Sequence, residues 1–280
     1  MNNMTKHSGD LPFRKMHGLG NDFVVVDTRH GPDLINEKTA KAIGNRYFGV
    51  GFDQLVVLRE SEVADLDVEF WNSDGSRANA CGNASRCIGQ IIMDETGKSD
   101  VTFRTGHAIL TASDAGDGLV SVNMGLPQLD WESVPLAHAV EDLTNLPLDG
   151  APGAVGMGNP HLVHVVDDVE SVDLRAIGPG LERHPLYPER TNVEFIQILD
   201  RETIRMRVWE RGGEITLACG SGACAVAVIA HLKGLTERKV TVHLDGGPLV
   251  LDWRDDGVWM TGPTAHVFDG VISAAFLDGV

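Results

Sequence analysis

The order of hydrophobic and polar positions predicts the same series of elements twice along this chain. An apolar strand leads to an amphipathic helix, which opens at Asp33-Leu34 in the first series and at Asp173-Leu174 in the second. An apolar strand follows, FDQLVVL or VEFIQIL, and then a more charged strand, LDVEFW or IRMRVW. A glycine-rich elbow with a cysteine, a second helix and two strands joined by a tight turn complete each series.

Matching residues of the two series lie 138 positions apart. Four pairs keep this offset without a gap: Asn21 and Asn159, Gln54 and Asn192, Trp71 and Trp209, Cys81 and Cys219. The repeated unit runs from about residue 13 to 125 and from about 151 to 263, far longer than a solenoid period. It therefore predicts two similar domains.

Strands outnumber helices in each half, and most connections are too short for parallel crossovers. We expect an α+β fold of two pseudo-symmetric domains, each a mostly antiparallel β-sheet wrapped around a central α-helix, with the active site in the cleft between them. The expected halves are residues 11–127 and 128–266. Residues 267–280 are expected to return to the first half, and residues 1–10 to form a polar tail.

Composition and charge exclude several classes of protein. Of the 280 residues, 42% are hydrophobic and 22% charged, which is typical of a folded chain. The net charge of -17 disfavours nucleic acid and anionic membranes as partners. No apolar stretch reaches the roughly 20 residues of a spanning helix, and the first ten residues lack the apolar segment of a signal peptide. Four cysteines are too few for a disulfide scaffold, so we expect a cytoplasmic protein.

The elbows ACGNASRC and ACGSGAC carry the candidate chemistry. In both, a Cys-Gly step precedes small and apolar residues at helical spacing, which predicts a helix that begins at Cys81 or Cys219. Unpaired N–H groups and the helix dipole at such a position favour a thiolate over a thiol. The same N–H groups would also bind a carboxylate.

Other interpretations of the cysteines are weaker. Five and four residues separate the cysteines within the two elbows, which is wider than the usual spacing of a structural zinc site, so no metal is expected. Cys87 and Cys224 lie among apolar helix positions and are expected to be buried. A disulfide between Cys81 and Cys219 would represent an oxidised, inactive state.

Two equivalent thiols on two facing domains suit the inversion of a stereocentre. One thiolate would remove a proton from one face of a carbon while the opposite thiol delivers a proton to the other face. Hydrolysis by a Cys–His pair needs no such twin. The chain has no recognisable pyridoxal phosphate lysine and no phosphate-binding glycine loop, so no cofactor is expected.

The motifs MHGLGNDFVVVD, GFDQLVVL, NSDGSRANACGNASRC, MGNPH, TNVEF and ERGGEITLACGSGACA together resemble the diaminopimelate epimerase family. The resemblance covers residues 13 to about 273. It implies a homodimer that converts LL-2,6-diaminopimelate to the meso form without a cofactor, in lysine and peptidoglycan precursor biosynthesis.

The family's functional residues transfer position by position. Cys81 and Cys219 match the two catalytic cysteines, and His161 and Glu210 match the pair that adjusts their pKa values. Gly82-Asn83 and Gly220-Ser221 match the segments that hold the reacting carboxylate. The other implied substrate contacts are Asn21, Gln54, Asn72, Asn159, Asn192, Glu210 and Arg211. The repeat is broken where Asn72 matches Glu210 and Phe23 matches His161, which would let one cleft select one stereochemistry at the unreacting end.

Three positions depart from the family pattern. Ala84 replaces a glycine after the first reactive cysteine, and Phe268 replaces a tyrosine linked to the dimer contact. Glu214 lies one place early in the ERGGEIT segment, so the role of its family counterpart does not transfer to it.

Two alternative functions stay open on the sequence. A racemase of proline or hydroxyproline shares the twin cysteines but needs no polar residues for a second amino-acid head group. A non-catalytic amino-acid-binding relative would not need to retain both thiols. His107, His138 and His266 are interpreted as structural or surface residues.

Overall fold

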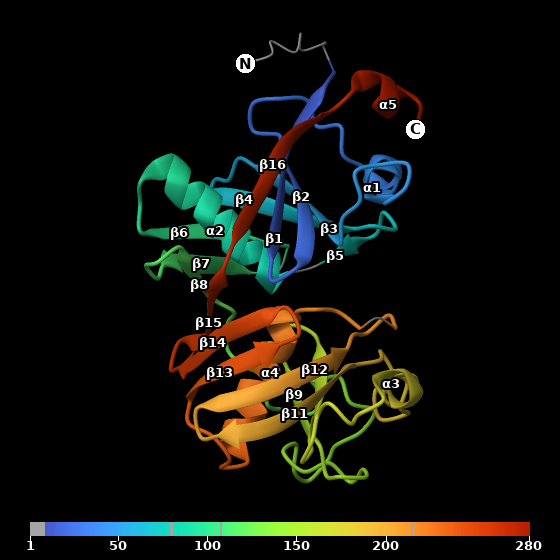
Figure 1. Cartoon of the computed structure of the whole chain (residues 1–280), viewed down its shortest axis with the longest axis vertical. Helices are drawn as coiled ribbons and strands as arrows, with labels where there is room; N and C mark the ends of the chain where they lie inside the picture. Colours follow the sequence, from blue (N-terminus) through green and yellow to red (C-terminus); the bar gives the residue numbers. More distant parts are fainter. Residues whose placement is uncertain (1–8, 79–80, 107, 214) are drawn as a thin grey trace. The chain divides into compact units, whose positions relative to one another are not determined.

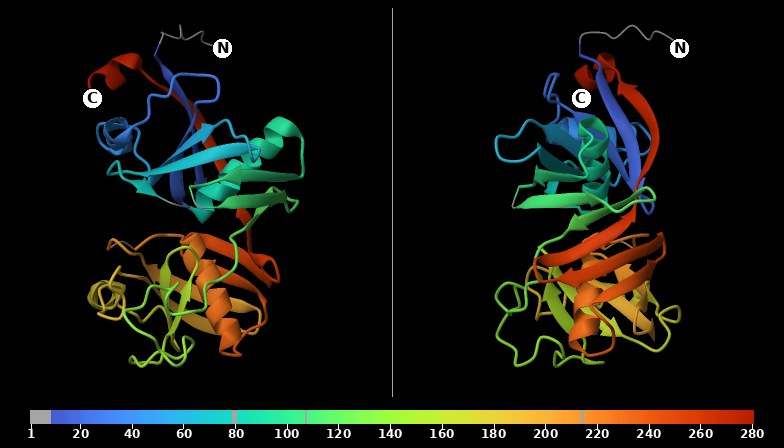
Figure 2. Two further views of the ribbon diagram at one scale, coloured as in Figure 1. Left: turned by 180° about the vertical axis from the view of Figure 1, so that it is seen from behind. Right: turned by 90° about the vertical axis from the view of Figure 1, so that its left-hand side faces the viewer.

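A computed structural model describes residues 9–78, 81–106, 108–213 and 215–280 of the chain. The chain divides into two compact units, and each combines a β-sheet with a few helices (Figures 1 and 2). Unit 1 comprises Met1–Asp114 and Pro263–Val280, and unit 2 comprises Ala115–Gly262. This is the α+β fold that the sequence predicts.

The sequence-based limits of the two halves stay predictions about which segments fold independently. They assign residues 11–127 with 267–280 to one half and residues 128–266 to the other. Of the expected polar tail, only residues 9 and 10 belong to the described part of the chain.

Unit 1 contains a sheet with the strand order β16-β1-β2-β3-β4-β6-β7, and β5 pairs beside β4. Its strands are β1 (Leu11–Gly18), β2 (Asn21–Asp27), β3 (Gln54–Arg59), β4 (Leu66–Asn72), β5 (Arg77–Ala78), β6 (Asp100–Arg104), β7 (Ile109–Asp114) and β16 (Ala265–Ile272). The β2–β3 and β4–β6 pairs are parallel, and the other pairs are antiparallel. Its helices are α1 (Glu37–Gly44), α2 (Gly82–Thr96) and α5 (Ala274–Asp278), and α2 packs against β1, β6 and β7.

Unit 2 contains a sheet with the order β8-β15-β14-β13-β12-β11-β10-β9. Its strands are β8 (Leu119–Asn123), β9 (Gly153–Gly156), β10 (Pro160–Val165), β11 (Asn192–Asp200), β12 (Thr203–Trp209), β13 (Lys239–Leu244), β14 (Gly247–Arg254) and β15 (Gly257–Pro263). The helices are α3 (Leu174–Glu182) and α4 (Gly220–Leu232). Helix α4 contacts β9 through β14, so the curved sheet wraps around it (Figure 1).

The strand registers of the two units repeat with the sequence offset. Phe23 lies opposite Gln54 in the parallel β2–β3 pair, and His161 lies opposite Asn192 in the parallel β10–β11 pair. In the antiparallel pairs that follow, Trp71 lies opposite Leu55 and Trp209 opposite Val193. Because a slip of one residue would turn every side chain to the other face of the sheet, equal register places equivalent residues at equivalent points of both units.

The first helix of each unit begins at a capping residue. Asp173 caps α3 as predicted, since its carboxylate accepts a hydrogen bond from the Ala176 N–H at 3.2 Å. The predicted start of α1 at Asp33 is wrong, because the cap is Asn36, which forms a reciprocal capping box with Thr39. The Asp33 carboxylate instead pairs with Arg59 at 2.6 Å.

Helix α4 is apolar around its whole circumference. From Ala223 to Ala230 every residue is buried, which a helix surrounded by a sheet requires. The longest helix, α2, has 15 residues. No helix in the described ranges has the length and apolar character needed to cross a bilayer.

Gly178 provides a test of the packing of α3 on the sheet. A Cβ atom there would lie 2.5 Å from the buried Trp209 ring, whereas one at Gly180 in the same helix would meet nothing within 4 Å. We expect Gly178→Ala to lower the free energy of urea unfolding by about 1–3 kcal/mol, and Gly180→Ala to leave it unchanged or to raise it by up to about 1 kcal/mol. Equal effects of the two substitutions would contradict this packing.

Candidate active site

The two cysteines predicted to be catalytic occupy the residue before the first turn of a helix in each unit. Cys81 caps α2 and Cys219 caps α4, and both have extended backbone angles (φ -149° and -119°). The prediction that helices begin at these cysteines is confirmed. The Cys81 Sγ accepts a hydrogen bond from the Ala84 N–H at 3.4 Å. All four cysteines are free thiols.

In unit 1, the side-chain amide of Asn21 lies beside the Cys81 thiol. Asn21 turns its carbonyl oxygen toward this thiol, 3.7 Å from Sγ, and accepts a hydrogen bond from Asn83 Nδ2 at 3.2 Å. Asn21 Nδ2 donates to the Asp53 carboxylate at 2.8 Å. Three predicted site residues, Asn21, Cys81 and Asn83, therefore form one hydrogen-bonded group. Arg86, fully buried in α2, supports the group by donating to Asn83 Oδ1 at 3.0 Å.

Two further predicted residues of unit 1 pair with each other. Gln54 on β3 donates through Nε2 to Asn72 Oδ1 on β4 at 3.3 Å. Asn72 in turn donates to the Ser76 hydroxyl at 3.0 Å. The Gln54 carbonyl oxygen is buried without a hydrogen-bond partner among the described residues, so it can accept from a ligand.

In unit 2, His161 connects Asn159 to a carboxylate that the sequence reasoning missed. His161 Nδ1 lies 2.6 Å from Glu194 Oε1, and His161 Nε2 lies 2.9 Å from Asn159 Oδ1. Both His161 and Glu194 are completely buried. The only sequence signal for Glu194 is a single acid within the apolar strand VEFIQIL, which by itself does not reveal a partner 33 residues away.

Carboxylates also surround the Cys219 thiol. Burial raises the pKa of Cys219 well above its ordinary value, and the negative charges of Glu210 and Glu194 raise this pKa further. Burial likewise raises the pKa of Glu210, although its hydrogen bond from the Thr216 hydroxyl acts in the opposite direction. Cys219 is therefore a neutral thiol at pH 7, and its Sγ lies 3.7 Å from the Ser221 hydroxyl.

The loop after β12 carries the predicted Arg211, and two polar side chains fix this loop. Asn192 accepts a hydrogen bond from the Arg211 N–H at 2.9 Å. Glu182, a second residue missed by the sequence reasoning, accepts from the Gly212 N–H at 3.1 Å and from the Trp209 indole at 3.0 Å. Within the described part of the chain the Arg211 guanidinium forms no ion pair, so it is available to a ligand. Glu214, whose role the sequence leaves open, lies outside the described residues, as does His107.

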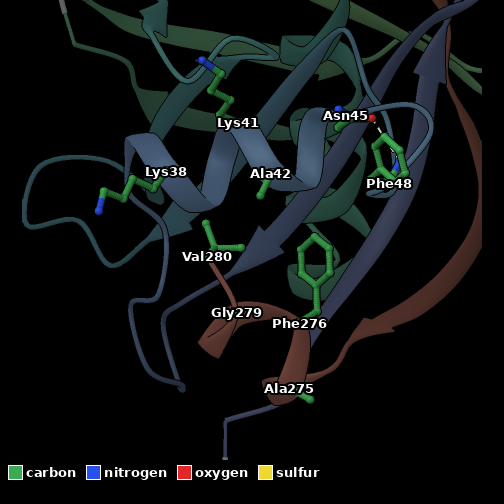
Figure 3. Close-up of a pocket in the computed structure, with 9 residues that line it drawn as sticks. All are labelled: Lys38, Lys41, Ala42, Asn45, Phe48, Ala275, Phe276, Gly279 and Val280. Carbon is green, nitrogen blue, oxygen red and sulfur yellow. Dashed lines mark hydrogen bonds between the residues drawn. The ribbon is translucent and has the colours of Figure 1, made fainter.

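Unit 1 also contains a groove of about 650 Å³, which is lined by residues other than those of the candidate site. It runs between α1 and α5 and is lined by Lys38, Lys41, Ala42, Asn45, Phe48, Ala275, Phe276, Gly279 and Val280 (Figure 3). None of the predicted site residues lines it. The described residues contain no cluster of three or more His, Cys, Asp or Glu side chains arranged to hold a metal ion.

Comparison with known proteins identifies the family. The family model described as diaminopimelate epimerase matches residues 13–129 and 153–267. The chain is 48% identical over 274 residues to the diaminopimelate epimerase of Rhodospirillum centenum, an alignment that covers 95% of this chain and 94% of the relative. It is 49% identical over 263 residues to that of Gluconobacter oxydans, with 93% and 98% covered. The chain belongs to the diaminopimelate epimerase family. Proteins of this name are isomerases.

Solved structures with the same fold are more distant in sequence. A phenazine biosynthesis protein of the PhzF family from Bacillus anthracis superposes with a TM-score of 0.68 at 14% identity, covering 94% of this chain and 99% of the other. A hydroxyproline epimerase from Agrobacterium vitis gives 0.63 at 13% identity, with 96% and 94% covered. At these identities the similarity establishes the fold alone. The fold of this diaminopimelate epimerase family member is thus the two-unit α+β fold that the repeat predicts.

The environments of the four thiols predict different rates of alkylation. Cys81 is partly exposed, Cys219 is 6% exposed, and Cys87 and Cys224 are fully buried, with the pKa of Cys87 raised by burial to about 12. Because the thiolate is the reacting form, we expect iodoacetamide at pH 8 to modify Cys81 first and Cys219 more slowly, by at least about tenfold. Cys87 and Cys224 should react only after unfolding in urea. Peptide mass spectrometry over time measures this order, and native labelling of Cys87 as fast as that of Cys81 would contradict it.

Proposed function

We propose that this chain interconverts LL- and meso-diaminopimelate, in lysine and peptidoglycan precursor biosynthesis, with Cys81 and Cys219 as the two proton carriers. The observation that carries this proposal is the presence of a cysteine at the same helix start in both halves of the repeat. Membership of the diaminopimelate epimerase family supports it. Because both proton carriers are side chains, the proposed reaction needs no cofactor.

The proposed reaction exchanges one proton for another at the α-carbon. The thiolate of one cysteine removes the α-proton and becomes a thiol, and the C–H electron pair stays on the substrate as a carbanion. The thiol of the other cysteine then protonates the opposite face and becomes the thiolate. The two cysteines have exchanged roles at the end, which matches a reaction that runs in both directions. This mechanism requires that both thiols reach one α-carbon.

The carbanion needs stabilisation, because an α-proton next to a carboxylate is only weakly acidic. We propose that the reacting carboxylate accepts hydrogen bonds from the first turns of the two helices, at Gly82-Asn83 on α2 and Gly220-Ser221 on α4. Backbone N–H groups at helix starts have no partner within the helix and point along the positive end of its dipole. Fixed donors of this kind stabilise the charge that develops in the transition state.

The second amino-acid head group of diaminopimelate needs both donors and acceptors. We propose that Arg211 binds its carboxylate, that Glu210 meets an ammonium group, and that Asn72, Asn159 and Asn192 complete the contacts. Asn21 and Gln54 would contact the substrate from unit 1. His161 and Glu210 would adjust the thiols, as the family resemblance implies.

A proline or hydroxyproline racemase is the alternative reaction. The structural similarity to a hydroxyproline epimerase concerns the fold alone, at 13% identity. A cyclic secondary amine has no second head group, and so would leave Arg211 and the asparagines without a ligand. A binding protein without catalysis would not need a thiol at both helix starts.

The proposed partners follow from the surface. A net charge of -17 opposes binding to nucleic acid. We propose a homodimer that uses β16, which forms an edge of the unit 1 sheet and exposes Val267 and Phe268. The requirement for two reduced thiols favours the cytoplasm as the site of the reaction.

Exchange of deuterium from solvent tests the two-cysteine mechanism. Reduced protein incubated with LL-diaminopimelate in D2O should form the meso isomer with deuterium at the inverted α-carbon. Cys81→Ala and Cys219→Ala should each lower the rate of epimerisation by at least about a hundredfold, because each removes a proton carrier. NMR and chiral chromatography follow the two signals together.

Cys87→Ala is the matched control, because Cys87 lies within α2 but not at its start. It should retain epimerisation. Failure of the wild-type protein to invert diaminopimelate, with inversion of proline or hydroxyproline in the same assay, would replace the proposed substrate.

Removal of the Arg211 guanidinium tests the contact with the far carboxylate. Arg211→Ala should lower kcat/KM for diaminopimelate by about 10- to 100-fold, since a charge-assisted hydrogen bond contributes about 1.5–3 kcal/mol. Arg211→Lys should recover only part of the loss, because lysine cannot form the two-pronged contact. Arg201→Ala, which removes a surface ion pair with Glu237, should leave steady-state kinetics unchanged. Wild-type kinetics for Arg211→Ala would remove Arg211 from the site.

A further inference from the structure

Asn21 and Asn159 occupy matching positions of the repeat, but their side-chain amides are oriented differently, so that the carbonyl oxygen of Asn21 faces the cysteine and that of Asn159 faces His161. Asn21 Nδ2 donates to the Asp53 carboxylate, so its carbonyl oxygen faces Cys81. A carboxylate only accepts hydrogen bonds, which fixes this direction. Asn159 instead has its carbonyl oxygen against His161 Nε2, at 2.9 Å. Its NH2 group has no acceptor within the described ranges and is left for a ligand.

His161 can hold the Asn159 carbonyl only as a hydrogen-bond donor. Its Nδ1 faces the Glu194 carboxylate at 2.6 Å, which is also an acceptor. Both ring nitrogens thus face acceptor oxygens, which is the hydrogen-bonding arrangement that suits an imidazolium. The burial of Glu194 leads to the same conclusion, because a completely buried carboxylate is costly without a counter-charge. Among the described residues, His161 is the only ion-pair partner of Glu194.

We propose that Glu194 is a positioning residue that keeps His161 protonated on both ring nitrogens, so that His161 holds the Asn159 carbonyl and the Asn159 NH2 group donates to a substrate carboxylate. The inference rests on the proposed function, since it concerns how Asn159 meets that substrate. It requires no contact between Glu194 and the substrate. The residues of unit 1 that match Glu194 and His161 are Val56 and Phe23, so this hydrogen-bonded arrangement is specific to unit 2.

Other titratable groups surround this pair. They are Glu210 after β12, Cys219 at the start of α4 and Tyr187 after α3, each of which is influenced by the charge of Glu194. Burial raises the pKa of all three groups. Within this cluster, Glu194 and His161 form the closest acid–base pair, at 2.6 Å. The second carboxylate oxygen of Glu194 is buried and has no hydrogen-bond partner in the described structure, which leaves His161 as the group that compensates its charge.

Nitrogen-15 NMR of the histidine side chains tests the protonation of His161 directly. In the intact protein labelled with [15N]histidine, the His161 signals are those missing from His161→Gln. At pH 7.5 the wild-type His161 should have both ring nitrogens protonated, and Glu194→Gln should convert it to a neutral ring. Glu182→Gln is the matched control, since it alters a buried carboxylate of unit 2 that does not contact His161, and it should leave the His161 signals unchanged. A neutral His161 in the wild-type protein would overturn the inference. This measurement does not depend on whether the Glu194 variant folds.

Steady-state kinetics separate positioning from a purely structural role. Glu194→Gln should raise KM for diaminopimelate by about tenfold and change kcat less, because it weakens one hydrogen bond to the part of the substrate that does not react. Asn159→Asp, which replaces the NH2 donor with an acceptor, should raise KM more than Asn159→Ala does. An unchanged KM in Glu194→Gln, or equal effects of the two Asn159 variants, would contradict the proposal. If the wild-type protein did not epimerise diaminopimelate while the NMR result held, the proposed function would fail and the role of Glu194 toward His161 would stand.

Discussion

The start of a helix at Cys81 and at Cys219 is the constraint on which both units depend. An extended residue before the first turn places its side chain beside N–H groups that the helix leaves unpaired. That placement is useful only if the helix itself does not move. In unit 2 the sheet wraps around α4 and buries it on every side, and in unit 1 α2 packs against β1, β6 and β7. The sheets therefore fix the two thiols through the helices.

The two units share the same strand registers but carry different side chains at several matching positions. The strand registers repeat at an offset of 138 residues, yet Phe23, Val56 and Asn72 of unit 1 match His161, Glu194 and Glu210 of unit 2. The difference extends to the helix start. A Cβ at Gly222 would lie 2.8 Å from Glu194 Oε1 and 3.2 Å from Cys219 Sγ, so unit 2 needs a glycine there. Ala84 takes the matching place in unit 1, where no carboxylate occupies the position of Glu194. An alanine is therefore sterically compatible with this position of unit 1.

Much of this arrangement could be predicted because it depends on local signals. The repeat, the fold class and the helix starts at the cysteines follow from periodicity and from the Cys-Gly steps. The buried residues Arg86, Glu182 and Glu194 could not be found in the same way. Each has a polar partner distant in the sequence, namely Pro263 for Arg86, Trp209 for Glu182 and His161 for Glu194. Hydrophobic patterning does not reveal such partners, because it treats a lone charge in an apolar segment as an exception. The start of α1 was misplaced for a related reason, since Asp33 and Asn36 both resemble caps and only the contact of Asp33 with Arg59 separates them.

The differences between the two units around their cysteines have a chemical use in this reaction, because they decide which thiol holds the proton at rest. A two-thiol exchange needs one thiolate and one thiol at every turnover, in either direction. Two identical environments would share the proton equally. The burial of Cys219 beside Glu194 and Glu210 raises its pKa, so the proton stays on this thiol at rest. The same carboxylates would repel a substrate carboxylate if nothing compensated them. In the proposed arrangement, an imidazolium at His161 would neutralise Glu194 and leave the Asn159 NH2 group as a donor, so that unit 2 would hold a protonated thiol and still receive an anionic group.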